Sequence, residues 1–489
     1  MLKTIRVILA AIFMIALTLL FLDFTGLLNS YLGWMAKLQL VPAILATNVI
    51  VVVALLIITA IIGRIYCSII CPLGICQDIS SFCADKRKKN RFLFSQPKKL
   101  TQYIRYSILA VFVVAIILRI SLISTLLEPY SAFGRMVTNL LSPFYLIGNN
   151  LMALFAEKMD SYAFYSVDIW LKSLATLIVA LITFFIIGIM SWKNGRIYCN
   201  TICPVGTALG LLSRKSLFRP QIDASQCVSC GICEKSCKAS CIDSKNKVID
   251  SQRCVVCFNC VERCPKKGVK FMKKTITDIN DSSRRNIIAG IGLFIFSFFT
   301  KKMKAYDFDG GLAELENKKA PTRLQNIIPP GADNLRSFSR KCTACQLCVS
   351  SCPNNVLRPA TNLQNFMQPQ LSFERGFCTP NCVTCSNVCP TGAINPISVE
   401  EKSAIQIGYA VWKSDLCVIN TDNVNCNLCA HTCPTGAITM IQKNENTRMP
   451  MMPVIDIHRC IGCGACEHRC PARPYSAIYV EGIDTHRNV

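Results

Sequence analysis

The stretch Cys342-Thr-Ala-Cys345-Gln-Leu-Cys348-Val-Ser-Ser-Cys352-Pro353 sets the character of the C-terminal third of the chain. Its spacing, C-x2-C-x2-C-x3-C, is the bacterial run that ligates [4Fe–4S] clusters. Three thiolates on one tight loop bind three irons of a cubane, and the fourth cysteine points away to serve the neighbouring cluster. The stretch therefore predicts a protein that carries electrons one at a time.

Five further runs share this pattern, so six quartets account for most of the 31 cysteines. Four quartets match the spacing strictly, whereas the fourth and fifth have a longer first gap. Zinc ribbons use C-x2-C pairs with longer spacers, and disulfides between such near neighbours need strained loops, so six [4Fe–4S] clusters are the favoured interpretation. The predicted ligands are Cys227, Cys230, Cys233 and Cys237; Cys254, Cys257, Cys260 and Cys264; Cys342, Cys345, Cys348 and Cys352; Cys378, Cys382, Cys385 and Cys389; Cys417, Cys426, Cys429 and Cys433; and Cys460, Cys463, Cys466 and Cys470.

The first two quartets are predicted to exchange their last cysteines. Cys264 then completes the cluster of the first run, and Cys237 completes that of the second. The pairing of the four C-terminal quartets stays open. Cys241 is left over and is interpreted as a buried thiol rather than a ligand.

Composition separates this chain of 489 residues from soluble enzymes. It is 52% hydrophobic and 17% charged, against about 25% charged in ordinary soluble domains. The net charge of +24 comes largely from basic residues beside apolar segments, which indicates membrane topology and not nucleic-acid binding. All four histidines follow residue 430 and no Cys-x-x-Cys-His is present, so we expect no haem.

Four apolar segments, 5–24, 44–62, 103–126 and 167–190, approach the ~20 residues that cross a hydrocarbon core. Basic residues before the first, between the second and third, and after the fourth place the N-terminus and the region after Met190 in the cytoplasm. A weaker stretch, 140–155, is interpreted as interfacial or re-entrant. The expected fold is an α-helical membrane domain of four spans plus a fifth anchor, with two α+β ferredoxin-like domains.

The expected domain boundaries follow the changes in composition. Ser283-Arg284-Arg285 precedes a short apolar run, 287–299, as in a twin-arginine export signal; the alternative is an ordinary fifth anchor. Either interpretation predicts a protein of the bacterial inner membrane whose C-terminal domain lies on the periplasmic side. The domains are a membrane domain (1–214), a cytoplasmic two-cluster domain (215–275), the signal or anchor (276–304), a linker (305–335) and a periplasmic four-cluster domain (336–489).

A second motif occurs twice in the membrane domain. Gly63-Arg-Ile-Tyr-Cys67-Ser-Ile-Ile-Cys71-Pro-Leu-Gly74 recurs as Gly195-Arg-Ile-Tyr-Cys199-Asn-Thr-Ile-Cys203-Pro-Val-Gly206. Cysteines at i and i+4 share one face of a helical turn, so Cys67, Cys71, Cys199 and Cys203 could ligate one further metal centre. The alternative is that they are redox-inert thiols in a packing motif.

The spans, the two C-x3-C-P repeats and the two-cluster domain that follows resemble the NapH family, a membrane component of a quinol dehydrogenase. The part from Ser283 onward resembles NapG, its periplasmic partner, so the chain looks like a fusion of the two. The resemblance implies oxidation of menaquinol or ubiquinol from the quinone pool. Electrons would pass to a periplasmic reductase or cytochrome.

Quinol oxidation needs a proton acceptor, and the expected site lies near the outer leaflet. Glu128 and Asp168 are the candidates, although loop or cap roles also explain both. Two other functions stay open. One is a transmembrane conduit from a cytoplasmic ferredoxin or flavodoxin to a periplasmic acceptor, and the other is a redox maintenance or assembly factor for an external metalloenzyme.

Overall fold

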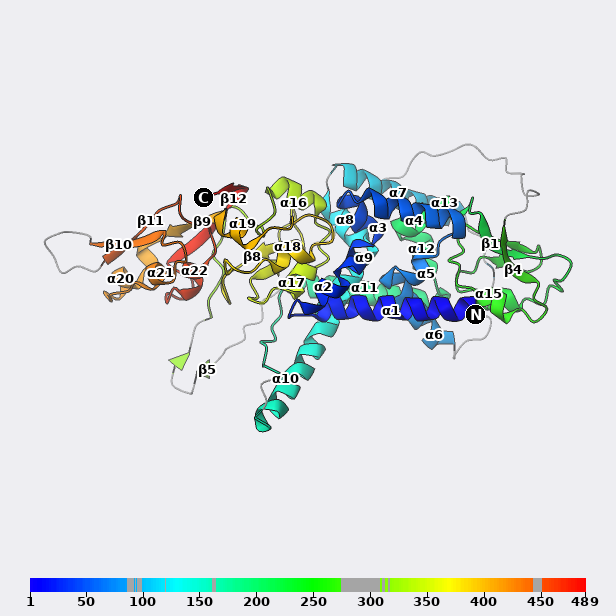
Figure 1. The fold of residues 1–489 in the computed structure, drawn as a ribbon, viewed down its shortest axis with the longest axis horizontal. Helices are drawn as coiled ribbons and strands as arrows, with labels where there is room; N and C mark the ends of the chain where they lie inside the picture. The colour runs from blue at the N-terminus through cyan, green and yellow to red at the C-terminus, as the bar shows by residue number, and fades with distance from the viewer. Residues whose placement is uncertain are drawn as a thin grey trace.

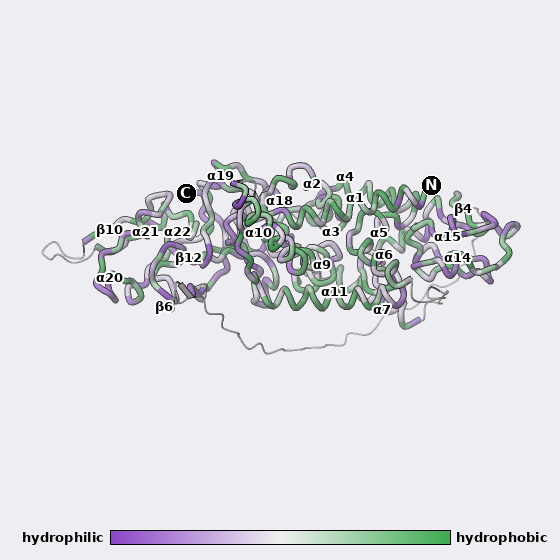
Figure 2. Tube along the Cα trace, turned by 90° about the horizontal axis from the view of Figure 1, so that it is seen from below, coloured by the Kyte–Doolittle hydropathy of each residue, from purple (hydrophilic) through white to green (hydrophobic). Residues whose placement is uncertain are grey.

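The computed structural model describes residues 1–85, 92, 94, 99–118, 120–160, 164–273, 308–309, 313–314, 317–442 and 451–489. A helical domain forms the middle of the molecule, and the two cysteine-rich domains lie at its opposite ends (Figure 1). The predicted Arg284-Arg285 signal and the fifth anchor fall outside the described residues. Hydrophobic residues concentrate along the helices of the middle domain (Figure 2).

Three described helices are long and apolar enough to cross a membrane: α1 (Leu2–Leu22), α7 (Lys99–Leu118) and α11 (Leu174–Asn194). The second expected span is shorter than predicted, because α4 (Val49–Ile62) has 14 residues and a length of about 21 Å. Thr47 adopts a left-handed φ of 54°, and the Asn48 side chain caps the new helix by accepting from the Val51 N–H. This break separates α4 from α3 (Leu40–Leu45).

Two other expected segments also change shape. The third ends at Leu118, and a separate helix, α8 (Ser121–Leu127), follows. The fourth begins only at Leu174, because residues 167–173 are not helical. The stretch taken as interfacial forms the π-helix Val137–Leu141 and α10 (Ser142–Lys158), which projects sideways from the bundle (Figure 1).

The two copies of the membrane motif have the same local structure. Each copy follows an apolar helix, α4 in the first copy and α11 in the second. The chain then turns at a glycine of positive φ (Gly63 at 88°, Gly195 at 60°) and continues as a short helix that carries the first cysteine. The second cysteine precedes a Pro-initiated helix. The elements are α5 (Tyr66–Ile69) and α6 (Pro72–Asp85) in the first copy, and α12 (Ile197–Thr201) and α13 (Pro204–Ser213) in the second. The other helices of this domain are α2 (Leu27–Lys37) and α9 (Pro129–Met136).

The domain after α13 is small and α+β. Strands β1 (Phe218–Ile222) and β4 (Val269–Lys273) pair antiparallel, as do β2 (Ile242–Asp243) and β3 (Val248–Ile249). Two short helices, α14 (Ile232–Lys235) and α15 (Asn259–Arg263), carry cysteines of the first two quartets. This domain lies against the N-terminal end of α1, where Lys3 forms an ion pair with Glu262.

The C-terminal domain is also built from short antiparallel strand pairs and short helices. Its antiparallel strand pairs are β7 (Leu357–Pro359) with β8 (Pro369–Leu371), β9 (Ile405–Trp412) with β12 (Ile478–Asn488), and β10 (Ile438–Gln442) with β11 (Met451–Ile455). A further two-residue pair joins β5 (Phe308–Asp309) and β6 (Ala313–Glu314). The helices are α16 (Leu335–Lys341), α17 (Leu347–Ser350), α18 (Thr384–Val388), α19 (Val399–Ala404), a 3-10 turn (Ser414–Leu416), α20 (Val418–Thr421), α21 (Leu428–His431) and α22 (Ala465–Arg469).

Candidate iron–sulfur centres

The four strict quartets share one backbone shape. In each, the residues immediately before and after the second cysteine have left-handed φ values: Ser229 and Gly231, Val256 and Phe258, Ala344 and Gln346, Gly462 and Gly464. A β-branched residue such as Val256 (φ 51°) rarely adopts this conformation, which costs on the order of 1–3 kcal/mol. Such strain is a hallmark of functional loops, and here it curls three cysteines around one point.

In the domain that carries the first two quartets (residues 215–275), which we call the dicluster domain, the structure brings together the cysteines that the exchange predicts. One small cavity is lined by the first run with Cys264, and another is lined by the second run with Cys237. The left-over Cys241 also lines the second cavity, and its Sγ lies 3.4 Å from that of Cys237. Five thiols therefore surround a space where four are needed.

The C-terminal pairing, which the sequence leaves open, follows the same exchange. The thiols of Cys342, Cys345 and Cys348 all lie within electrostatic range of Cys389. Those of Cys378 and Cys385 lie within electrostatic range of Cys352, and both also neighbour Cys382. In the outer half, Cys429 lies near Cys417, Cys426 and Cys470. Cys433 lies near Cys460 and Cys463, and both of these neighbour Cys466. The third quartet therefore pairs with the fourth, and the fifth pairs with the sixth.

The cysteines of the membrane motif also converge. Cys67, Cys71, Cys199 and Cys203 are at most 4% exposed, and each thiol lies within electrostatic range of the other three. We call these four residues the tetrad. The amide of Gln77 donates to Cys199 Sγ at 3.1 Å, and the Gly206 N–H donates to Cys203 Sγ at 3.3 Å. Such donors stabilise a thiolate.

Two buried arginines link the copies of the motif across the tetrad. Arg196 Nη1 of the second copy donates to the Cys67 carbonyl at 2.7 Å, and Arg64 Nη2 of the first donates to the Cys199 carbonyl at 3.2 Å. Both side chains are fully buried. The final glycine of each copy permits this approach, because a Cβ on Gly74 or Gly206 would lie 2.3 or 2.2 Å from the same carbonyls.

The charge around the tetrad suits a cluster bound by thiolates. Arg64 has no carboxylate partner among the described residues; it contacts Asn200, the carbonyls of Cys199 and Gln252, and Cys67 Sγ at 4.0 Å. A buried cation without a counter-ion is costly, so an anion is expected beside it. A [4Fe–4S] core with four thiolates is anionic, and the residues present therefore fit the group. In the described part of the chain, no group of three or more His, Cys, Asp or Glu side chains, the tetrad included, is arranged to hold a single metal ion.

The dicluster domain lies directly against the tetrad. The N–H of Arg196 donates to the Lys238 carbonyl at 2.9 Å, and Arg64 Nη1 donates to the Gln252 carbonyl at 3.0 Å. Lys238 follows Cys237, and Gln252 precedes Cys254 by two residues. The arginines that flank the tetrad thus also hold the loops of the neighbouring cluster.

The C-terminal domain contacts the other end of the bundle through α9. Arg135, buried beside the motif residue Tyr198, donates to the Ala344 carbonyl at 3.4 Å. A Cβ on Gly134 would lie 2.5 Å from the Cys345 carbonyl, so this glycine allows the cluster loop to approach. Lys172 Nζ donates to the Val349 carbonyl at 2.6 Å. The loop of the third quartet therefore lies against the helical bundle at α9.

The two candidate proton acceptors occupy different settings. Glu128 is buried and caps α9, where its carboxylate accepts from the backbone N–H groups of Tyr130 (3.1 Å) and Ser131. This is the cap role foreseen as the alternative. Asp168 lines a cavity of about 130 Å³ between the bundle and Cys352. Glu128 also lies within electrostatic range of Tyr66, the motif residue that precedes Cys67.

Sequence reasoning missed several residues of these centres. Arg64, Arg196, Gly74 and Gly206 were visible as identical positions of the repeat, but their contacts cross between copies. Nothing in the sequence pattern marked Asp78 as part of these centres. Its carboxylate accepts from Arg6 Nη1 at 2.8 Å and from Arg196 Nε at 2.9 Å.

The fold and these centres define an iron–sulfur protein of the ferredoxin type. The family profile described as "4Fe-4S binding domain" matches residues 45–90 and 176–222, the ranges that contain the tetrad. The profile described as "4Fe-4S dicluster domain" matches 341–393 and 424–473, which contain the paired C-terminal quartets except Cys417. No solved structure matches the chain.

Curated relatives agree with this class. The "Methylamine utilization ferredoxin-type protein MauM" of Methylophilus methylotrophus is 31% identical over 33% of this chain and 72% of its own length. The "Ferredoxin-type protein NapG" of Escherichia coli is 30% identical over 33% of this chain and 75% of its own length. NapF of the same species is 26% identical over 33% of this chain and 87% of its own length. The chain belongs to the MauM and NapG family of ferredoxin-type proteins.

Proposed function

We propose that this protein transfers electrons across a bacterial inner membrane, between a cytoplasmic dicluster domain and a periplasmic four-cluster domain. A [4Fe–4S] cluster supplies one-electron transfer wherever four of these thiolates hold it. The observation that carries the proposal is the position of the buried tetrad between the two cysteine-rich domains. Of the interpretations that the sequence leaves open, the transmembrane conduit fits this arrangement best.

The contacts on either side of the tetrad support the proposal. Arg64 and Arg196 bind both the tetrad loops and the loops of the dicluster domain. On the other side, Arg135 and Gly134 bring the Cys345 loop against α9. With a seventh cluster at the tetrad, the cysteine loops form a series from one end of the molecule to the other. The expected partners are a cytoplasmic ferredoxin or flavodoxin at one end and a periplasmic reductase or cytochrome at the other.

Vesicles that contain the full chain test this function. Ferricyanide is enclosed inside the vesicles, dithionite is added outside, and the loss of ferricyanide colour reports electrons that cross the bilayer. We expect the wild type and Cys83→Ser, which lies outside the tetrad, to bleach the dye. The double variant Cys67→Ser/Cys199→Ser should not. Equal rates in all three proteins would contradict the proposal.

Quinol oxidation is the second candidate function. One observation favours it, a large cavity between the membrane domain and the dicluster domain. In that case the chain takes electrons from the quinone pool, as a quinol dehydrogenase component of the kind that the NapH resemblance implies.

A further inference from the structure

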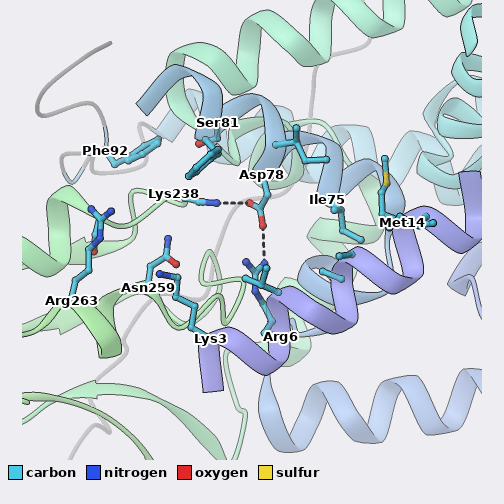
Figure 3. Close-up of a pocket in the computed structure, with 17 residues that line it drawn as sticks. Lys3, Arg6, Met14, Ile75, Asp78, Ser81, Phe92, Lys238, Asn259 and Arg263 are labelled. Carbon is cyan, nitrogen blue, oxygen red and sulfur yellow. Dashed lines mark hydrogen bonds and ion pairs between the residues drawn. The ribbon is translucent and has the colours of Figure 1, made fainter. Parts of the chain in front are cut away.

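A cavity of about 590 Å³ lies where α1, α6 and the dicluster domain meet (Figure 3). Ligand pockets typically enclose about 300–1,000 Å³. The cavity near Asp168, where the sequence suggested a quinol site, encloses only about 130 Å³. Size therefore favours the dicluster side of the molecule for a small-molecule ligand.

One end of this cavity is polar and carries a donor without a partner. Arg6 is 5% exposed, and its Nη1 is paired with Asp78 at 2.8 Å, but its Nε has no hydrogen-bond partner in the described chain. Lys238 Nζ lies 3.5 Å from the same carboxylate, and the three side chains point toward one another in Figure 3. A buried N–H that lacks an acceptor is destabilising. A ligand with a carbonyl or hydroxyl oxygen would satisfy it.

The other end of the cavity is apolar and faces outward from the bundle. Ala10, Ala11 and Met14 line it from α1, and Ile75 and Ile79 line it from α6. The two alanines leave space where longer side chains would fill the wall. Ile79 is 52% exposed, on a surface that the proposed function places in lipid. A ligand that enters here from the bilayer would keep an apolar tail in the membrane.

A third part of the cavity lining comes from neighbours of predicted cluster ligands in the dicluster domain. Ser236 and Lys238 flank Cys237, and Asn259 precedes Cys260. Both cysteines line the second cavity of the dicluster domain. A ligand in the large cavity would therefore lie beside a predicted redox centre. A phospholipid also has a polar head and an apolar tail that match the two ends of the cavity. The adjacent cluster loop, however, favours a redox-active molecule.

We propose that this cavity binds the head group of an isoprenoid quinone, with Arg6, Lys238 and Asn259 facing its oxygens and the tail along Ala11 and Ile79. The inference rests on quinol oxidation, the second candidate function, and moves its site from the outer side to the dicluster side. It does not depend on electron transfer across the membrane.

Photolabelling of the full chain in vesicles tests the site. The probe is an azido-ubiquinone, and labelled peptides are mapped by mass spectrometry. We expect label on α1 or α6, and a decrease of about tenfold in Ala11→Trp, which fills the cavity. The matched control is Ile12→Phe, a neighbouring exposed position that does not line it, and its labelling should match the wild type.

Competition separates quinone from lipid. Excess decylubiquinone should remove the label, whereas excess phosphatidylglycerol should not. Displacement by the lipid alone, or labelled peptides confined to the region around Asp168, would overturn the inference. The two proposals can fail separately. A wild type that bleaches ferricyanide but is not photolabelled would refute only the quinone site. A wild type that is photolabelled but does not bleach ferricyanide would refute only electron transfer across the membrane.

Discussion

The guanidinium of Arg196 donates a 2.7 Å hydrogen bond to the backbone carbonyl of Cys67, a residue 129 positions earlier in the chain. Arg64 makes the corresponding bond to Cys199. Each copy of the motif thus supplies two thiols to the tetrad and one arginine that holds the loop of the other copy. Neither half of the site is complete without the other.

Iron content measures the tetrad directly. Seven clusters give about 28 iron atoms per chain, from four irons per cluster. The variant Cys71→Ser should lower this to about 24, because the tetrad then lacks one of its four thiolates. Iron is determined on anaerobically purified protein. The control Cys83→Ser should keep the wild-type value, and an unchanged iron content in Cys71→Ser would contradict cluster binding at the tetrad.

Arg64 is expected to set the redox potential of the tetrad. Its positive charge lies near Cys67 Sγ and favours the more negative, reduced form. Arg64→Gln should therefore lower the reduction potential of one centre, measured by redox titration followed by electron paramagnetic resonance. Lys215→Gln, an exposed basic residue on the same side of the bundle, serves as the control. A potential that does not change in Arg64→Gln would count against an anionic cluster beside this residue.

Gly206→Ala should destabilise the helical domain. The new Cβ would lie 2.2 Å from the Cys199 carbonyl, so the backbone must shift at a cost of about 1–3 kcal/mol. Thermal unfolding followed by intrinsic fluorescence provides the measurement. Gly188→Ala in α11 is the matched control, because nothing lies within 4 Å of its added Cβ. Equal melting temperatures for the two variants would show that the close approach is not essential.

Asp78→Asn should cost about 3–5 kcal/mol, because it leaves two buried arginines, Arg6 and Arg196, without their counter-ion. Burial raises the pKa of Asp78, but Arg196, Lys238 and Arg6 outweigh it and hold the pKa well below its ordinary value. Its stabilising effect is therefore present above the unfolded-state pKa and is lost as pH falls below it.

Thermal unfolding of wild type and Asp78→Asn at pH 7 and near pH 4 checks this dependence. The difference between the two proteins should be smaller at the lower pH. The exposed Asp484→Asn is the control and should have a small effect at both values. A difference that grows on acidification would contradict the ionised state assigned to Asp78.

The sequence predicted the parts of this protein that depend on local spacing. The C-x2-C-x2-C runs specify their loops because three ligands lie within seven residues. The motif cysteines do not share one helical turn as the i, i+4 spacing suggested, because the first lies in a short helix and the second lies between that helix and the next. Contacts between segments that lie far apart in the chain could not be predicted from local spacing. The Arg196–Cys67 bond, the ion pairs of Asp78 and the pairing of the C-terminal quartets all join residues far apart in the chain.

The length of a span was also misjudged where a single residue breaks it. The apolar run from Ile44 to Ile62 reads as continuous, but Thr47 takes a left-handed conformation and Asn48 starts a new helix. Glu128 illustrates the opposite case. A glutamate followed by Pro129 is a pattern typical of a helix start, and the structure uses it as one.

Helix α1 touches both cysteine-rich domains: Lys3 pairs with Glu262 at one end, and the other end packs on α17. One continuous helix of 21 residues therefore extends from one domain to the other. One inserted residue would lengthen it by 1.5 Å and turn its far end by about 100°. The number of residues in α1 therefore contributes to the spacing between the two cysteine-rich domains.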